Sequence, residues 1–92
     1  MELYTFIMEY LGGTYISQVK AQDEYNAMRQ WISNLNVHEI KGLTIRDKQK
    51  IIKNDFEDEE AVLIKGIKNT WHFSIRTKKG IGFVNFVMTK KN

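Results

Sequence analysis

The C-terminal part of the chain, residues 71–88, alternates apolar and polar side chains on both sides of the dipeptide Lys79-Gly80. Alternation with a period of two is typical of a β-strand that buries one of its faces. A lysine-glycine pair between two such runs predicts a hairpin with a two-residue turn, because turns of this type favour glycine at positive φ. One face of the hairpin is then wholly apolar. Its facing pairs are Trp71 with Met88, Phe73 with Phe86, and Ile75 with Val84.

The opposite face of this hairpin is more apolar than a solvated surface and more polar than a core. It carries His72, Ser74, Arg76, Lys78, Ile81, Phe83, Asn85 and Val87. Because apolar side chains that are exposed together usually have a partner, this face is the first candidate for a functional surface.

A second hairpin is predicted for residues 3–10 and 14–21, which flank Gly12-Gly13. With the turn at the two glycines, one face is rich in aromatic residues and suits the core. Its facing pairs are Tyr4 with Ala21, Phe6 with Val19, and Tyr10 with Tyr15. The other face is mixed and carries Thr5, Ile7, Glu9, Leu11, Ile16, Gln18 and Lys20.

Residues 61–67 predict a further strand, joined to the C-terminal hairpin by a tight turn at Lys68-Asn69. In this pairing Gly66 lies opposite Trp71, and Val62 lies opposite Ile75. Three more residues then join the mixed face. They are Leu63, Lys65 and Ile67.

The hydrophobic period changes to about 3.6 residues after Asp23, which is a suitable helix N-cap. The apolar stripe of this first helix consists of Tyr25, Met28, Trp31, Ile32 and Leu35. Thr44 followed by Asp47 predicts the cap of a second helix that ends near Asn54. Its apolar stripe is thin, which favours a peripheral position. Residues 55–60 form an acidic loop, with Phe56 as its anchor.

These elements predict an α+β fold: a five-stranded, mainly antiparallel sheet, in the sequence order ββααβββ, with the helices packed on one face. The 92 residues, 42% of them hydrophobic, fit one domain that spans residues 1–92. The strand order between the two hairpin groups is left open. The sequence has no cysteine, which excludes disulfides and thiolate metal sites. Its apolar runs are far shorter than the roughly 18 residues of a membrane span, and no signal pattern begins the chain, so we expect a cytoplasmic protein that does not contact the membrane.

The mixed sheet face predicts a noncatalytic interaction domain that forms a homodimer or binds another protein. The residues predicted to form this surface are Leu63, Lys65, Ile67, His72, Arg76, Ile81, Phe83 and Val87. Two alternatives stay open: the second helix or the acidic loop covers this face, or a different strand order scatters its residues. No catalytic group, cofactor site or metal site is predicted, because the two histidines lack the spacing of metal ligands.

The octapeptide Lys79-Gly80-Ile81-Gly82-Phe83-Val84-Asn85-Phe86 resembles the octamer of RNA-recognition-motif proteins, in which aromatic residues alternate on an open sheet face. The resemblance implies that Phe83 stacks on a base and that Lys79 contacts a phosphate. Weak binding of single-stranded RNA through the C-terminal hairpin is therefore the alternative function, with nucleic acid as the alternative partner.

Overall fold

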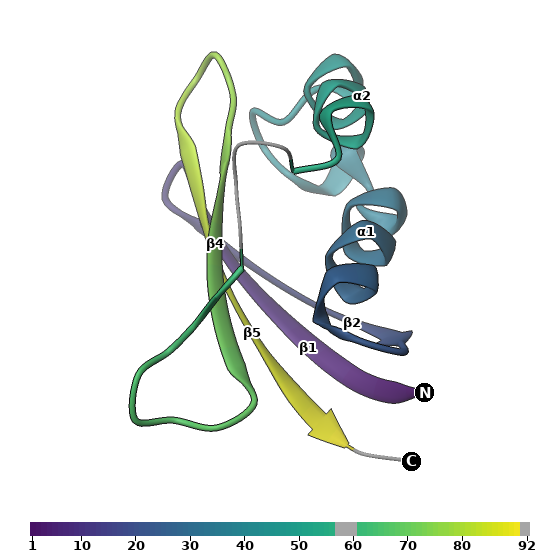
Figure 1. The fold of residues 1–92 in the computed structure, drawn as a ribbon. Helices are drawn as coiled ribbons and strands as arrows, with labels where there is room; N and C mark the ends of the chain where they lie inside the picture. Colours follow the sequence, from purple (N-terminus) through teal and green to yellow (C-terminus); the bar gives the residue numbers. More distant parts are fainter. Residues whose placement is uncertain (57–60, 91–92) are drawn as a thin grey trace.

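The computed structural model describes residues 1–56 and 61–90. Its elements are, in chain order, β1 (Glu2–Tyr10), β2 (Gly13–Ala21), α1 (Glu24–Asn34), the short 3-10 helix η1 (Val37–Glu39), α2 (Ile45–Asn54), β3 (Val62–Leu63), β4 (Thr70–Arg76) and β5 (Ile81–Lys90). The strands form one antiparallel sheet in the order β2-β1-β5-β4-β3. Both α-helices lie on the same side of this sheet (Figure 1). The predicted α+β fold is therefore confirmed.

The two hairpins are joined side by side through the pairing of β1 with β5, in which Phe6 faces Phe86. The rings of these two residues stack at 4.4 Å between centroids. Trp31 of α1 stacks on Phe6 at 5.5 Å and meets the edge of Phe73 at 5.4 Å. The first helix is thus anchored on the sheet by one tryptophan at the centre of an aromatic cluster, in agreement with the predicted packing of the helices on one face of the sheet.

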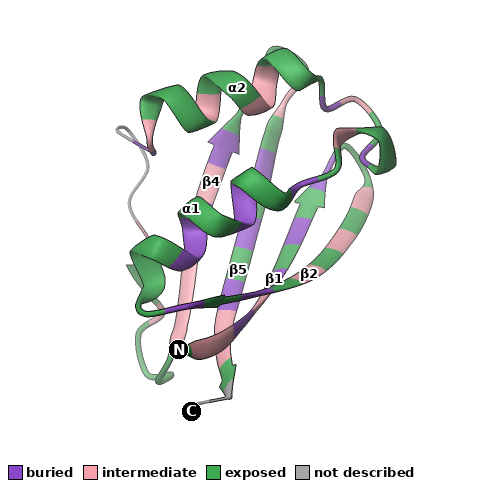
Figure 2. Cartoon of the chain, turned by 90° about the vertical axis from the view of Figure 1, so that its right-hand side faces the viewer, coloured by how far each residue is buried: buried purple, intermediate pink, exposed green. Residues whose placement is uncertain are grey.

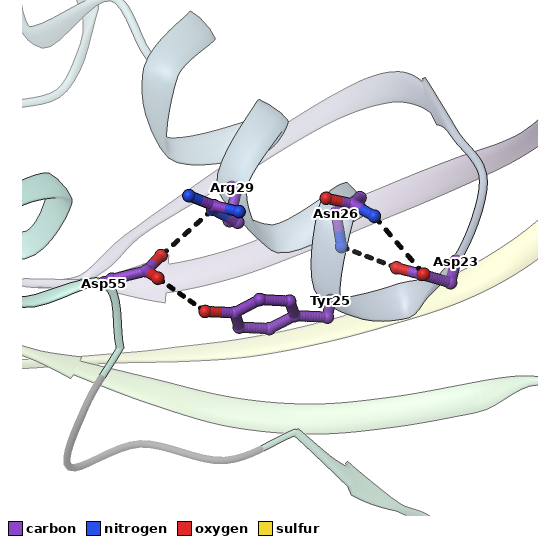
Figure 3. A network of polar contacts seen from close by, with 5 residues as sticks. All are labelled: Asp23, Tyr25, Asn26, Arg29 and Asp55. Carbon is purple, nitrogen blue, oxygen red and sulfur yellow. Dashed lines mark hydrogen bonds and ion pairs between the residues drawn. The ribbon is translucent and has the colours of Figure 1, made fainter.

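The N-terminus of α1 begins where the sequence predicts, at Asp23. Its carboxylate accepts a hydrogen bond from the backbone N–H of Asn26 at 2.8 Å (Figure 3). The prediction that Tyr25 belongs to the apolar stripe of this helix is wrong, because its side chain is 45% exposed. The Tyr25 hydroxyl instead donates to Asp55 at 2.5 Å, and Arg29 pairs with the other oxygen of the same carboxylate at 3.1 Å. Tyr25 therefore links α1 to the end of α2 and does not extend the core.

The second helix is capped as predicted, since the hydroxyl of Thr44 accepts from the backbone N–H of Asp47 and the Asp47 carboxylate accepts from that of Thr44. None of the residues in α2 is buried, in agreement with its predicted peripheral position. Lys48 holds it against α1 by donating to the carbonyl oxygen of Leu35 at 2.8 Å. Phe56 is the predicted anchor, since it is buried with its ring 5.5 Å from that of Phe73. The rest of the predicted acidic loop, residues 57–60, lies outside the described residues.

The turn of the first hairpin lies one residue earlier than predicted. Its central residues are Leu11 and Gly12, at φ of +47° and +82°, and Tyr10 faces Gly13. A Cβ atom on Gly13 would lie 2.7 Å from the hydroxyl oxygen of Tyr15, so side-chain packing and not the turn requires this glycine. The predicted pairs shift by two residues, but the predicted faces of the strands are correct, because an even shift keeps each side chain on its side of the sheet. The observed pairs include Tyr4 with Val19, Phe6 with Ser17, and Met8 with Tyr15.

The turn of the C-terminal hairpin is displaced in the same direction. Lys78 and Lys79 occupy its centre, and the backbone N–H of Thr77 donates to the carbonyl oxygen of Gly80 at 2.9 Å. The Thr77 hydroxyl accepts from the N–H groups of Lys79 and Gly80, both at 3.3 Å, so a threonine side chain organises the turn that the sequence assigns to glycine. The observed pairs are Trp71 with Phe86, Phe73 with Val84, and Ile75 with Gly82.

Candidate functional site

The candidate site is the side of the sheet that faces away from the helices, here called the outer face. Figure 2 views the molecule from the helix side and shows α1 and α2 lying together in front of the strands. Strand alternation places the outer face on the residues between the buried ones, such as Ile7 between Phe6 and Met8. Within residues 1–56 and 61–90, no helix covers this face. The alternative that the second helix covers the outer face is therefore wrong. The alternative that the acidic loop covers it depends on residues 57–60, which lie outside the described residues.

An apolar ridge crosses the outer face over its three longest strands. It is defined by Ile7, Ile16, Phe83 and Val87. Ile16 of β2 faces Ile7 of β1, and Ile7 faces Asn85 of β5. Phe83 and Val87 lie two residues to either side of Asn85 on the same face, so both are diagonal neighbours of Ile7, within reach of large side chains. Ile16 is 67% exposed and Phe83 is 51% exposed. The strand order thus places these exposed side chains on one continuous surface.

The polar side chains beside the ridge are paired with one another. Gln18 donates to the hydroxyl oxygen of Thr5 at 2.9 Å, and Thr14 donates to the carboxylate of Glu9 at 2.7 Å. His72 and Asn85 form a hydrogen bond at 3.0 Å between Nδ1 and Oδ1. Polar groups that already have partners lose less when they leave water, so this face can be covered at a smaller cost than an unpaired polar surface.

The predicted position of Leu63 on the outer face is wrong. β3 comprises only Val62 and Leu63, and Leu63 faces Trp71, on the helix side of the sheet. Val62 faces His72 and takes the outer position opposite His72 that the predicted pairing assigns to Lys65. The displacement from the predicted pairing is odd, and an odd shift exchanges the two faces of a strand.

Lys65 and Ile67 also lie outside the outer face, because the chain leaves the sheet after β3. The backbone N–H of Ile67 donates to the carbonyl oxygen of Ile64 at 3.2 Å, and Gly66 has a φ of +84°. Asn69 also has a positive φ, of +58°. Two turn-forming residues this close together are the signal that could have predicted an irregular connection in place of a strand.

The remaining predicted surface residues lie on the outer face. His72, Ile81, Phe83 and Val87 alternate with buried positions of β4 and β5, and Arg76 faces Ile81 at the end of the hairpin. The outward position of Phe83 and the inward positions of Val84 and Phe86 are as the alternation of the C-terminal hairpin predicts. Leu11, predicted to join this face, belongs instead to the first turn, and its Cδ atoms would lie 2.5 Å and 3.0 Å from Cβ atoms built on Gly42 and Gly80.

Two tyrosines have perturbed ionisation. The hydrogen bond to Asp55 raises the pKa of Tyr25 above its usual 10.0, and burial raises the pKa of Tyr4. Both shifts favour the neutral phenol and give no group poised for catalysis near neutral pH. In the described part of the chain, histidine and acidic side chains do not gather into a group of three that could bind a metal.

Neither α1 nor α2 has the length and hydrophobicity of a membrane span. Comparison of the chain with protein families, with curated proteins and with solved structures found no match.

Proposed function

We propose that this protein is a noncatalytic cytoplasmic interaction domain that forms a homodimer through its outer face. The observation that carries the proposal is the apolar ridge, which lies on the side of the sheet opposite both helices. A two-fold axis through the ridge would place the same side chains of two copies against each other, as symmetric dimers require. The domain is small, and covering a sheet face is a common way for such domains to gain stability.

Phe83 is expected to supply a large part of the association energy. An aromatic side chain presents about 200 Å² of surface, and Phe83 is 51% exposed, which leaves about 100 Å² of its surface to bury. At about 25 cal/mol per Å² this corresponds to about 2.5 kcal/mol from each copy, or about 5 kcal/mol in a symmetric dimer, as an upper limit. Removal of Phe83 should therefore weaken association by up to about 4,000-fold.

Size-exclusion chromatography with light scattering tests the proposal. At micromolar concentration we expect a mass near twice the 10.9 kDa of the chain. Phe83→Asp should give the monomer mass, because it introduces two charges at the centre of the interface. Ile52→Asp is the matched control: Ile52 is 43% exposed on α2, away from the outer face, so this variant should stay dimeric. A monomeric wild-type protein, or equal loss of the dimer in both variants, would contradict the proposal.

A further inference from the structure

A second surface lies at the end of the molecule where α2 approaches the turn between β4 and β5 (Figure 1). A cavity of about 640 Å³ opens between these two elements. Five of its lining side chains are cationic, and they form what is here called the basic groove. They are Arg46 and Lys50 of α2, and Arg76, Lys78 and Lys79 of the hairpin.

The positive charge of the basic groove is not balanced by the acidic side chain that lines it. Asp47 is the acidic residue of the lining, and its carboxylate is engaged at 3.0 Å and 2.8 Å by the backbone N–H and hydroxyl of Thr44. Within residues 1–56 and 61–90, no ion pair includes Arg46, Lys50 or Lys78. These cations converge on one cavity from two elements, whereas the lysine that holds α2 to α1, Lys48, is not part of the lining. The groove therefore complements a ligand with several negative charges.

The two walls of the groove are fixed to each other by a buried hydroxyl. Tyr10 is 1% exposed, and its hydroxyl oxygen lies 2.7 Å from that of Thr77 in the β4–β5 turn. The same hydroxyl donates at 3.3 Å to the carbonyl oxygen of Gly42, in the segment that leads into α2. Leu11 packs between these segments, against Gly42 and Gly80. The two walls that carry the cations thus have a defined arrangement before a ligand arrives, which lowers the entropic cost of binding.

We propose that the basic groove binds the phosphates of a single-stranded nucleic acid, without regard to its sequence. Even without Arg76, the four other cations around the cavity exceed what a single phosphate group can use, so a chain of phosphates is the better complement. Among the described residues of the lining there is no aromatic side chain on which a base could stack, so we expect binding that does not depend on the bases. The groove involves α2, which lies on the helix side of the sheet, so this inference goes beyond the proposed dimer and does not depend on it.

The experiment is fluorescence anisotropy with a labelled oligothymidylate and with a mixed-sequence RNA of equal length. We expect similar affinities for both strands. With four phosphates engaged and a salt slope of about −0.7 per phosphate, the affinity should fall about 50-fold between 50 mM and 200 mM salt. The proposal would be overturned if the anisotropy did not change at low salt. It would also be overturned by a strong preference for one of the two oligonucleotides.

Two double variants with the same change of net charge locate the site. Lys50→Glu with Lys78→Glu reverses one cation on each wall and should weaken binding at least about tenfold and flatten the salt dependence. Lys20→Glu with Lys53→Glu is the matched control, because both lysines are exposed and neither lines the groove. It should bind at near wild-type affinity. Circular dichroism verifies that both variants are folded.

Three results would refute the assignment. The first is equal loss of binding in the two double variants, which would indicate a general effect of net charge. The second is wild-type affinity of the groove variant together with loss of binding in Phe83→Ala. This result would place the nucleic acid on the outer face, as the resemblance of the octapeptide implies. The third is displacement of the oligonucleotide by polyglutamate at equal charge concentration, which would indicate an acidic protein segment as the partner.

Discussion

Gly82 lies within the octapeptide, and replacing it with alanine separates a packing requirement from a binding requirement. A Cβ atom on Gly82 would lie 2.8 Å from Cγ1 and 3.2 Å from Cδ1 of Ile75, and 3.3 Å from Sδ of Met8. Favourable contacts between carbon atoms are about 3.5–4.0 Å long. Gly82 does not have a positive φ, so alanine can adopt its backbone conformation. Any loss of stability in Gly82→Ala must therefore come from crowding in the core.

Two opposing effects set the size of this loss. Insertion of a methyl group into a packed core costs about 1–3 kcal/mol, whereas replacement of glycine lowers the entropy of the unfolded chain and returns about 0.5–1 kcal/mol. The expected net destabilisation is between about 0 and about 2.5 kcal/mol, with a central value of about 1 kcal/mol. A domain of this length is stable by about 5–14 kcal/mol, so Gly82→Ala should fold and remain measurable.

Urea unfolding followed by tryptophan fluorescence gives the free energy of unfolding of each variant. In an Ile75→Ala background, Gly82→Ala should cost much less, because Cγ1 and Cδ1 of Ile75, the two atoms that it would crowd most, are absent and only Sδ of Met8, at 3.3 Å, remains of the three. In a Val84→Ala background, which leaves Ile75 in place, it should keep its full cost. A cost that is the same in the Ile75→Ala background and in the wild type would refute the packing argument.

Three further predictions concern the elements that support the two surfaces. Asp47→Ala removes half of the capping box of α2 and should lower the free energy of unfolding by about 1 kcal/mol, measured in urea, with Gln49→Ala as an exposed control on the same helix. Tyr10→Phe removes the hydroxyl between the walls of the basic groove and should cost about 1 kcal/mol in the same assay; an unchanged midpoint would contradict a structural role for this contact. The neutral phenol of Tyr25 donates to Asp55 and has a raised pKa, so the stability from this contact is complete below pH 10.0 and is lost as the pH rises through the raised value. Tyr25→Phe should therefore lose less stability than the wild type as the pH rises above 10.0, and identical alkaline profiles would contradict this assignment.

The sequence predicts faces better than it predicts pairs, and the two main hairpins show why. A turn that moves by one residue shifts each cross-strand pair by two, and an even shift leaves every side chain on its face. Phe6 and Phe73 therefore reach the core although their predicted partners are wrong. The position of each turn depends on side chains that the local pattern does not reveal, such as Thr77 in the second hairpin.

The prediction failed for β3 because its pairing shift is odd and its strand is short. The local alternation of residues 61–67 satisfies a strand, but only Val62 and Leu63 pair with β4. The basic groove was missed for a different reason. Arg46 and Lys50 are about thirty residues from the hairpin lysines in the sequence, and only the three-dimensional contact of α2 with the β4–β5 turn brings these charges to one cavity.

Different features of the structure explain different residues of the octapeptide. Gly82 is accounted for by the packing of Ile75, and Gly80 closes a turn against which Leu11 packs. Phe83 and Lys79 are left as its two candidate binding residues, and they lie on different surfaces: Phe83 on the apolar ridge, Lys79 in the lining of the basic groove. The resemblance implies a single RNA site, in which a base stacks on Phe83 and Lys79 binds a phosphate. Their separation instead favours two independent surfaces, so variants at one should leave binding at the other unchanged.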